Sequence, residues 1–168
     1  MRRAKGTIHA FTFKDGVLSA VAHDLRIRLE KFEITLDGNV VRGEFDLKSL
    51  FVDGPMEKGV LQANQYDAGK RADVEKAMHG DVLHTDKYPT AVFTGTASEQ
   101  GAGYSVKGEL ELAGKKAPLA FDVQKEGGAF RTSFEIQPSQ WGIAQYKALL
   151  GAIRLKDVVR IEAALSEA

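Results

Sequence analysis

The sequence predicts an all-β protein with one inserted helix. Several segments alternate apolar and polar residues with a period of two, which is typical of strands that bury one face. Glycine-centred turns such as Asp37-Gly38-Asn39 separate these segments, as in β-hairpins. One stretch, residues 67–79, has helical spacing instead. Roughly eight or nine strands with hairpin links predict an antiparallel sheet that closes or packs face to face.

The alternation also locates the individual strands. Leu25, Ile27 and Leu29 alternate in one phase, and the residues from Phe32 onward alternate one step later. An extra residue near Glu30-Lys31 therefore predicts a β-bulge that redirects the strand. The predicted strands cover residues 6–13, 17–21, 25–36, 41–47, 91–98, 104–112, 117–123, 130–136 and 159–165.

The predicted helix separates two of these strands. Asp67 is a suitable N-cap, and Val74, Ala77 and Met78 lie at helical spacing among charged residues. The preceding segment, 53–66, is long enough to form a flap together with the helix. We expect one end of the fold to be closed by Leu61, Tyr66, Met78 and Trp141.

Glycines on the apolar face of the strands favour a barrel over a sandwich. Gly43, Gly95 and Gly108 occupy positions where a filled sandwich would more often carry Val, Ile or Leu. A glycine inside a strand usually marks a bend at a barrel corner or the close approach of another group. The sandwich remains the alternative at this point.

Composition limits the class of function. The 168 residues suggest one domain, 1–168, and the 23 basic and 23 acidic residues balance, which argues against a nucleic-acid partner. The absence of cysteine excludes disulfides and thiolate chemistry. No window is apolar enough for an integral membrane span, and no leader is visible. With Met1 as the natural start we expect a cytoplasmic protein; removal of a leader would instead make it periplasmic.

The histidines are weak candidates for catalysis or metal binding. His23 and His84 lie near carboxylates, but none of His9, His23, His79 and His84 has zinc-site spacing. The sequence also has no nucleophile elbow and no phosphate-binding loop. We therefore predict no enzyme activity, catalytic residue, metal or cofactor; catalysis around His23 or His84 is the less favoured hypothesis.

Aromatic and aliphatic residues on the apolar strand faces are better candidates for a binding site. Either they line a channel that holds an alkyl or prenyl chain, or they form a packed core. Strand phase directs Arg26, Arg28, Arg131, Arg154 and Arg160 outward. The candidate ligand-binding residues are Phe11, Phe45, Phe93, Tyr104, Leu110, Leu112, Phe121, Phe130, Phe134 and Trp141.

Four segments resemble a known family, and the loosest match is Arg71-Ala72-Asp73-Val74 leading into Val82-Leu83, which is similar to the family's helix and following loop. Residues 85–93, with Tyr88, Pro89 and Phe93, resemble the tyrosine–proline stretch of the YceI-like family. Residues 104–119 are similar to its glycine-containing hairpin, and residues 134–165 to its C-terminal region. The resemblance covers roughly residues 6–165, which is nearly the whole chain.

The resemblance implies a lipocalin-like, eight-stranded antiparallel barrel with an apolar channel. It implies non-enzymatic binding or carriage of a long-chain amphipathic lipid, such as a polyisoprenoid. The alternative is a compact barrel with a filled core that acts through protein–protein contacts. A homodimer is compatible with either function, because strand edges and the helix could pair.

Overall fold

The computed structural model describes residues 1–15, 23–148, 151 and 153–168. Its strands are β1 (Arg2–Lys14), β2 (Asp24–Leu29), β3 (Phe32–Asp37), β4 (Val40–Asp46), β5 (Leu50–Glu57), β6 (Val60–Leu61), β7 (Thr90–Gln100), β8 (Gly103–Leu112), β9 (Lys115–Glu126), β10 (Ala129–Ile136), β11 (Lys147–Ala148) and β12 (Ile153–Glu167). Its helical segments are η1 (Leu47–Ser49), η2 (Ala63–Gln65), α1 (Ala68–Ala77), η3 (Met78–Val82) and η4 (Pro138–Trp141). The predicted strand 17–21 lies outside the described residues.

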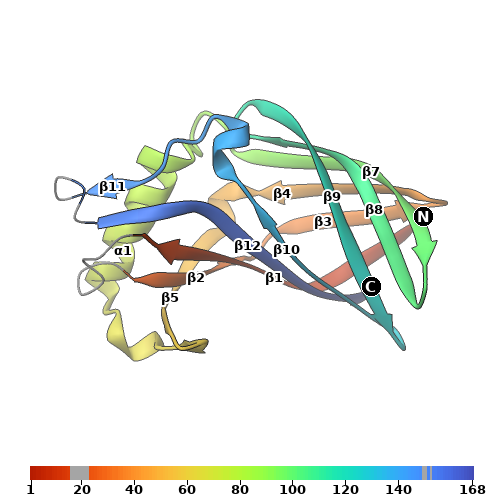
Figure 1. The fold of residues 1–168 in the computed structure, drawn as a ribbon, viewed down its shortest axis with the longest axis horizontal. Helices are drawn as coiled ribbons and strands as arrows, with labels where there is room; N and C mark the ends of the chain where they lie inside the picture. The colour runs from red at the N-terminus through yellow and green to blue at the C-terminus, as the bar shows by residue number, and fades with distance from the viewer. Residues whose placement is uncertain (16–22, 149–150, 152) are drawn as a thin grey trace.

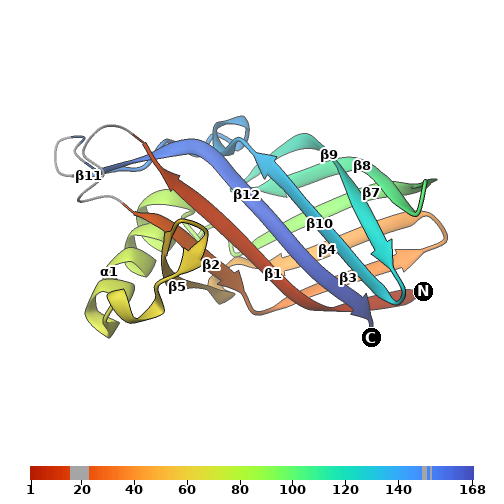
Figure 2. The same ribbon diagram turned by 60° about the horizontal axis from the view of Figure 1, so that its bottom comes forward.

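Within the described ranges, eight antiparallel strands close into a barrel, which confirms the predicted fold class (Figures 1 and 2). The strand order around the barrel is β1, β3, β4, β7, β8, β9, β10, β12 and back to β1. The register of the closing pair runs from Ala4 opposite Glu167 to Lys14 opposite Leu155. A sandwich is excluded because the sheet returns to its first strand.

The sheet divides where the sequence predicted a bulge. The first residues of β1 pair with β3, and Ile8–Thr12 pair with β2, which continues into β5 and β6 beside the barrel. Residues 30–31 belong to neither strand. Ser49 holds this break, because its carbonyl accepts from the Glu30 N–H at 3.1 Å and its Oγ accepts from the Lys31 N–H at 2.8 Å. The same Oγ donates to the Asp46 carbonyl at 2.7 Å.

Replacement of Ser49 by alanine is expected to lower the free energy of unfolding by about 1–3 kcal/mol. Ser49 is only 4% exposed, so the variant leaves a backbone donor and a backbone acceptor without their partner. Urea denaturation followed by circular dichroism measures the change. Ser98→Ala, at an exposed position on β7, is the control, and an equal loss in both variants would contradict the assigned role.

Helix α1 lies at one end of the barrel, and both chain termini lie at the opposite end (Figure 1). The Asp67 carboxylate accepts from the Lys70 N–H at 2.8 Å, which confirms the predicted N-cap. Val74 and Met78 pack against Ile27 and Val52, so the helix covers that end. None of the helices formed by the described residues is long and apolar enough to cross a membrane.

Most of the segment expected as a flap is regular structure. Its first residues belong to β5, which pairs with β2, and the chain then returns through β6 and η2. Leu61 packs beside Gly54, while Tyr66 and Met78 reach a cavity at the helix end. The sequence did not indicate β5, because its Asp53-Gly54-Pro55 stretch is typical of a turn.

Candidate functional site

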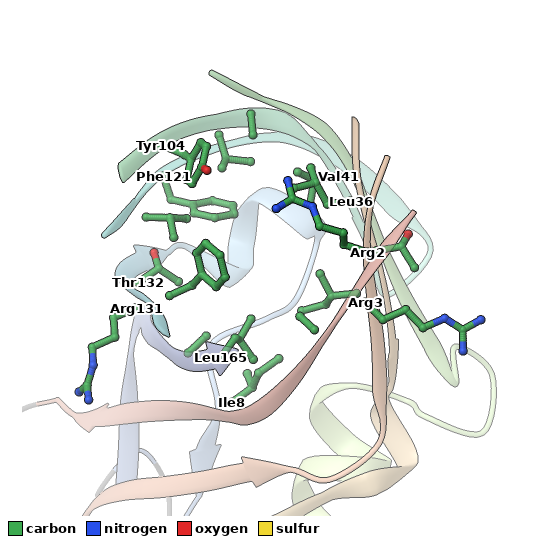
Figure 3. Close-up of a pocket in the computed structure, with 18 of the residues that line it drawn as sticks. Arg2, Arg3, Ile8, Leu36, Val41, Tyr104, Phe121, Arg131, Thr132 and Leu165 are labelled. Carbon is green, nitrogen blue, oxygen red and sulfur yellow. The ribbon is translucent and has the colours of Figure 1, made fainter. Parts of the chain in front are cut away.

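Three cavities follow one another through the barrel. The terminal cavity, about 220 Å³, lies near the chain termini and has Ile8, Tyr104 and Leu165 among its walls (Figure 3). The central cavity, about 280 Å³, shares Ile8, Phe45, Phe121, Phe134 and Ile161 with it. The helix-end cavity, about 230 Å³, shares Thr12, Ile27, Met78, Val82, Pro138, Ile143 and Val159 with the central one. Because each cavity shares wall residues with the next, the three form one row along the barrel.

Eight of the ten predicted ligand-binding residues line this row of cavities. Tyr104 and Phe130 face the terminal cavity. The residues that face the central cavity only are Phe93, Leu110 and Leu112, and those that face both are Phe45, Phe121 and Phe134. Both cavities have apolar walls, so the alternation correctly assigned these side chains to the barrel interior.

Phe11 is absent from the walls of the three cavities. Ile8, Ala10 and Thr12 line the interior from β1, so Phe11 lies on the outer face of this strand. It is 7% exposed because the Arg160 guanidinium covers its ring, with Cζ 4.6 Å from the ring centroid. The prediction chose the more hydrophobic face of β1, whereas pairing with the neighbouring strands turns the smaller residues inward.

Trp141 is also absent from the walls of the three cavities. It is 1% exposed, and its Nε1 donates to the Leu110 carbonyl at 2.8 Å. Its neighbours in the core include Leu47, Leu112 and Ile143. Its role in the described structure is to tie η4 to β8.

The inward glycines are covered by phenylalanine rings. Gly95 and Gly108 are opposite each other in β7 and β8, and a Cβ on either would lie 2.7–2.8 Å from Cζ of Phe93. A Cβ on Gly43 would lie 2.6 Å from Cζ of Phe45. The glycines therefore let these rings lie flat against the wall instead of crossing the interior. The glycines thus make room in the barrel interior indirectly, because they provide a surface against which the rings lie.

Sequence reasoning missed the small and aliphatic part of the lining. Ile8 and Ala10 on β1, and Ile161, Ala163 and Leu165 on β12, face the terminal or central cavity. The alternation of residues 159–165 indicates that this strand also has an inward face. The predicted ligand-binding residues, however, were limited to larger side chains on other strands.

Charged residues surround the outer end of the terminal cavity. The Arg2 side chain extends over the cavity, while Arg3 and Arg131 point away from it (Figure 3). Arg2 Nη1 lies 2.8 Å from Glu167 Oε1, which joins the ends of β1 and β12. Sequence reasoning missed Arg2 and Glu167, because both lie outside the predicted strands.

The family model for the YceI-like domain matches residues 9–166. The chain belongs to the YceI-like family. This confirms the resemblance inferred from the tyrosine–proline segment and the hairpin.

Solved structures of other proteins have the same fold. Burkholderia cenocepacia BcnA is 18% identical, with a TM-score of 0.66 over 95% of this chain and 94% of that chain. A polyisoprenoid binding domain from Saccharophagus degradans, implicated in plant cell wall breakdown, is 12% identical, with a TM-score of 0.62 over 99% and 97% of the two chains. The YceI protein of Campylobacter jejuni is 14% identical, with a TM-score of 0.57 over 84% of each chain. No curated protein matches the sequence.

In this YceI-like barrel, polar groups gather at the helix end. Burial raises the pKa of Tyr66, so its phenol stays protonated, and its ring meets that of His23 edge-on at 5.9 Å. Gln145 and Tyr146 also line the helix-end cavity. Thr12 Oγ1, between this cavity and the central one, is buried and has no hydrogen-bond partner among the described residues. The terminal and central cavities therefore have apolar walls, whereas the walls of the helix-end cavity are partly polar.

The histidines do not gather into a catalytic or metal site. His79 Nε2 donates to the Leu50 carbonyl at 3.0 Å, and its Nδ1 lies 3.0 Å from the buried Thr85 hydroxyl, so it ties η3 to β5. His84 lies in the loop after η3 with a φ of 50°. In the part of the chain that the structure covers, no three His, Asp or Glu residues lie together as a metal site would require.

His9 makes stability depend on pH. It lies on the outer face near Arg26, Arg28, Asp53 and Glu162, and burial, reinforced by Arg26, lowers its pKa below the ordinary 6.5. Folding thus disfavours the protonated imidazole, and the free energy of unfolding is expected to fall as the pH drops below 6.5. Urea denaturation between pH 7.5 and pH 5 measures this loss. His9→Gln should reduce the slope, and an unchanged slope would contradict the assignment.

Proposed function

We propose that this YceI-like protein binds a long-chain amphipathic lipid, with a polyisoprenoid as the preferred class, and acts as a carrier rather than an enzyme. The observation that carries the proposal is the row of cavities, two of them with apolar walls, along the barrel interior. The similarity to a polyisoprenoid binding domain supports this choice of ligand class. A filled core, which the alternative function requires, does not agree with these cavities.

Apolar contact alone is sufficient to hold such a ligand. Burial of one CH₂ group contributes about 0.8 kcal/mol, so roughly ten groups contribute about 8 kcal/mol before the cost of ordering the chain. The polar groups of the helix-end cavity then set the direction of the ligand. The apolar tail occupies the central and terminal cavities, and the polar head lies near Tyr66 and Thr12.

Extraction of protein purified from its native source, followed by mass spectrometry, tests the ligand class. The expected result is a prenyl lipid enriched over the lipids of the same cell extract. The Ala163→Phe variant, whose ring fills the terminal cavity, is purified in parallel. Lipids that are recovered from the unmodified protein but not from this variant are those that occupy the barrel. Recovery of bulk membrane lipids alone, at equal levels from both proteins, would overturn the proposal.

Replacement of Tyr66 by phenylalanine tests the direction of the ligand. The variant removes a hydroxyl at the helix-end cavity and keeps the ring. Affinity for geranylgeraniol is expected to fall about 2- to 10-fold, which corresponds to one hydrogen bond, while affinity for the hydrocarbon without the hydroxyl stays constant. Competition against a fluorescent fatty acid measures both affinities. Tyr88→Phe, at a tyrosine that lines none of the three cavities, is the matched control and should change neither affinity by more than about twofold.

A further inference from the structure

Strands β9 and β10 are joined along only part of their length. Their register covers Glu126–Ala129, Lys125–Phe130 and Gln124–Arg131, and no further pair follows among the described residues. The opposite edge of β9 stays paired with β8 from Val123 to Lys115, and the opposite edge of β10 stays paired with β12 as far as Ile136. We call the unpaired stretch, Lys115–Val123 facing Thr132–Ile136, the seam.

Side chains rather than a backbone ladder bridge the seam. Thr132 Oγ1 donates to the Asp122 carbonyl at 2.6 Å. One step further, the rings of Phe121 and Phe134 stack with centroids 4.5 Å apart and an angle of 14° between their planes. Both rings line the terminal and the central cavity, so their stack forms the wall of the binding site at the seam.

The outer surface is hollowed at the same place. A polar groove of about 410 Å³ is lined by residues that include Asp122, Gln124 and Ser133. Arg131, Thr132 and Ala163 border both this groove and the terminal cavity. The groove outside and the cavity inside therefore meet across a single layer of residues.

We propose that the seam is the lateral portal through which the apolar chain of the ligand enters and leaves the barrel. Opening it separates one pair of stacked rings and breaks one side-chain hydrogen bond, whereas opening any fully paired strand junction breaks a ladder of backbone bonds. The two ends offer less direct routes, because α1 covers one and the Arg2 side chain extends over the other (Figure 3). A chain that enters sideways also avoids threading its whole length along the axis. This inference rests on the proposed lipid binding.

The absence of cysteine in the chain allows a clean test with a reversible clamp. Asp122 and Ser133 are both exposed on the outer face, and they would be opposite if the β9–β10 register continued. In Asp122→Cys/Ser133→Cys, oxidation joins the two strands across the seam. Stopped-flow fluorescence with cis-parinaric acid then gives the association and dissociation rates. Thr96→Cys/Lys107→Cys, a directly paired and exposed position in β7 and β8, is the matched control.

Oxidation of the seam variant is expected to slow association and dissociation together by tenfold or more. The equilibrium affinity should stay within about twofold, and a reductant should restore both rates. The control variant should show equal rates in both redox states. If the cysteines do not join directly, a short bis-methanethiosulfonate reagent bridges them and is removed by the same reductant.

Two results would overturn the proposal that the seam is the portal. Rates that are the same in the clamped and reduced seam variants would show that the ligand uses the barrel ends. Equal slowing in the seam and control variants would show that entry depends on general motion of the barrel. Failure of the unmodified protein to bind cis-parinaric acid or a prenol would instead overturn the proposed function itself.

Discussion

Replacing Ala163 with phenylalanine is expected to abolish measurable lipid binding while the barrel stays folded. Ala163 lies on β12, opposite Ile8 of β1 and Thr132 of β10, and it faces the terminal cavity of about 220 Å³. A benzyl group there occupies the space that the ligand chain needs. Because the ring enters a cavity rather than a filled core, the loss of folding free energy should stay below the usual overpacking cost of about 1–3 kcal/mol.

Fluorescence titration with cis-parinaric acid measures binding by this variant, and urea denaturation measures its stability. The control is Thr96→Phe, at an exposed position on β7 that lines neither the terminal cavity nor the polar groove. Thr96→Phe should bind within about twofold of the unmodified protein, because an exposed substitution of this kind changes free energies by only about 0.5 kcal/mol. Wild-type affinity in Ala163→Phe would show that the ligand does not occupy the terminal cavity.

Replacing Gly108 with alanine is expected to weaken both folding and binding. A Cβ at this position would lie 2.6 Å from the Gly95 Cα and 2.8 Å from Cζ of Phe93, and it would also meet the Thr94 carbonyl oxygen. Two of these contacts are with backbone, so the wall must deform, at a cost of about 1–3 kcal/mol. The displaced Phe93 ring then moves towards the central cavity, and affinity falls with it.

Urea denaturation and the same titration measure the two effects of Gly108→Ala. Gly128→Ala is the matched control, because a Cβ there meets no other atom within 4 Å. Its stability should stay within about 0.5 kcal/mol of the unmodified protein. A stable Gly108→Ala variant with normal affinity would contradict the role assigned to the glycines beneath the Phe93 ring.

Local periodicity was sufficient to predict most of the barrel and much of the cavity lining. In β7–β10 one face is clearly apolar, so Phe93, Leu110, Phe121 and Phe134 were correctly assigned to the interior. In β1 both alternating sets contain apolar residues, and Phe11 made the wrong face look more hydrophobic. The long-range register determines which face of β1 points into the barrel. It places Phe11 opposite Arg160 and Ala10 opposite Ile161.

The sequence predicts where the sheet divides between β2 and β3, but it does not show which residue stabilises the division. The change of phase after Leu29 indicated the break at residues 30–31. Ser49, which satisfies the backbone groups at this break, is remote in sequence, and its role depends on how β4 continues into β5. The seam was equally hidden, because β9 and β10 have the ordinary pattern of a hairpin that pairs along its full length.

The pairing of β1 with β12 has a consequence for how the chain folds. It joins Ala4 to Glu167 and Lys14 to Leu155, so the contacts that close the barrel connect the two ends of the sequence. Contacts of such high sequence separation require a large loss of chain entropy before they form, and proteins rich in them fold slowly. The hairpins from β7 to β10 can form locally and early, whereas the ring cannot close until the last strand is present. During synthesis on the ribosome, the apolar interior therefore stays open to solvent and to chaperones until β12 emerges.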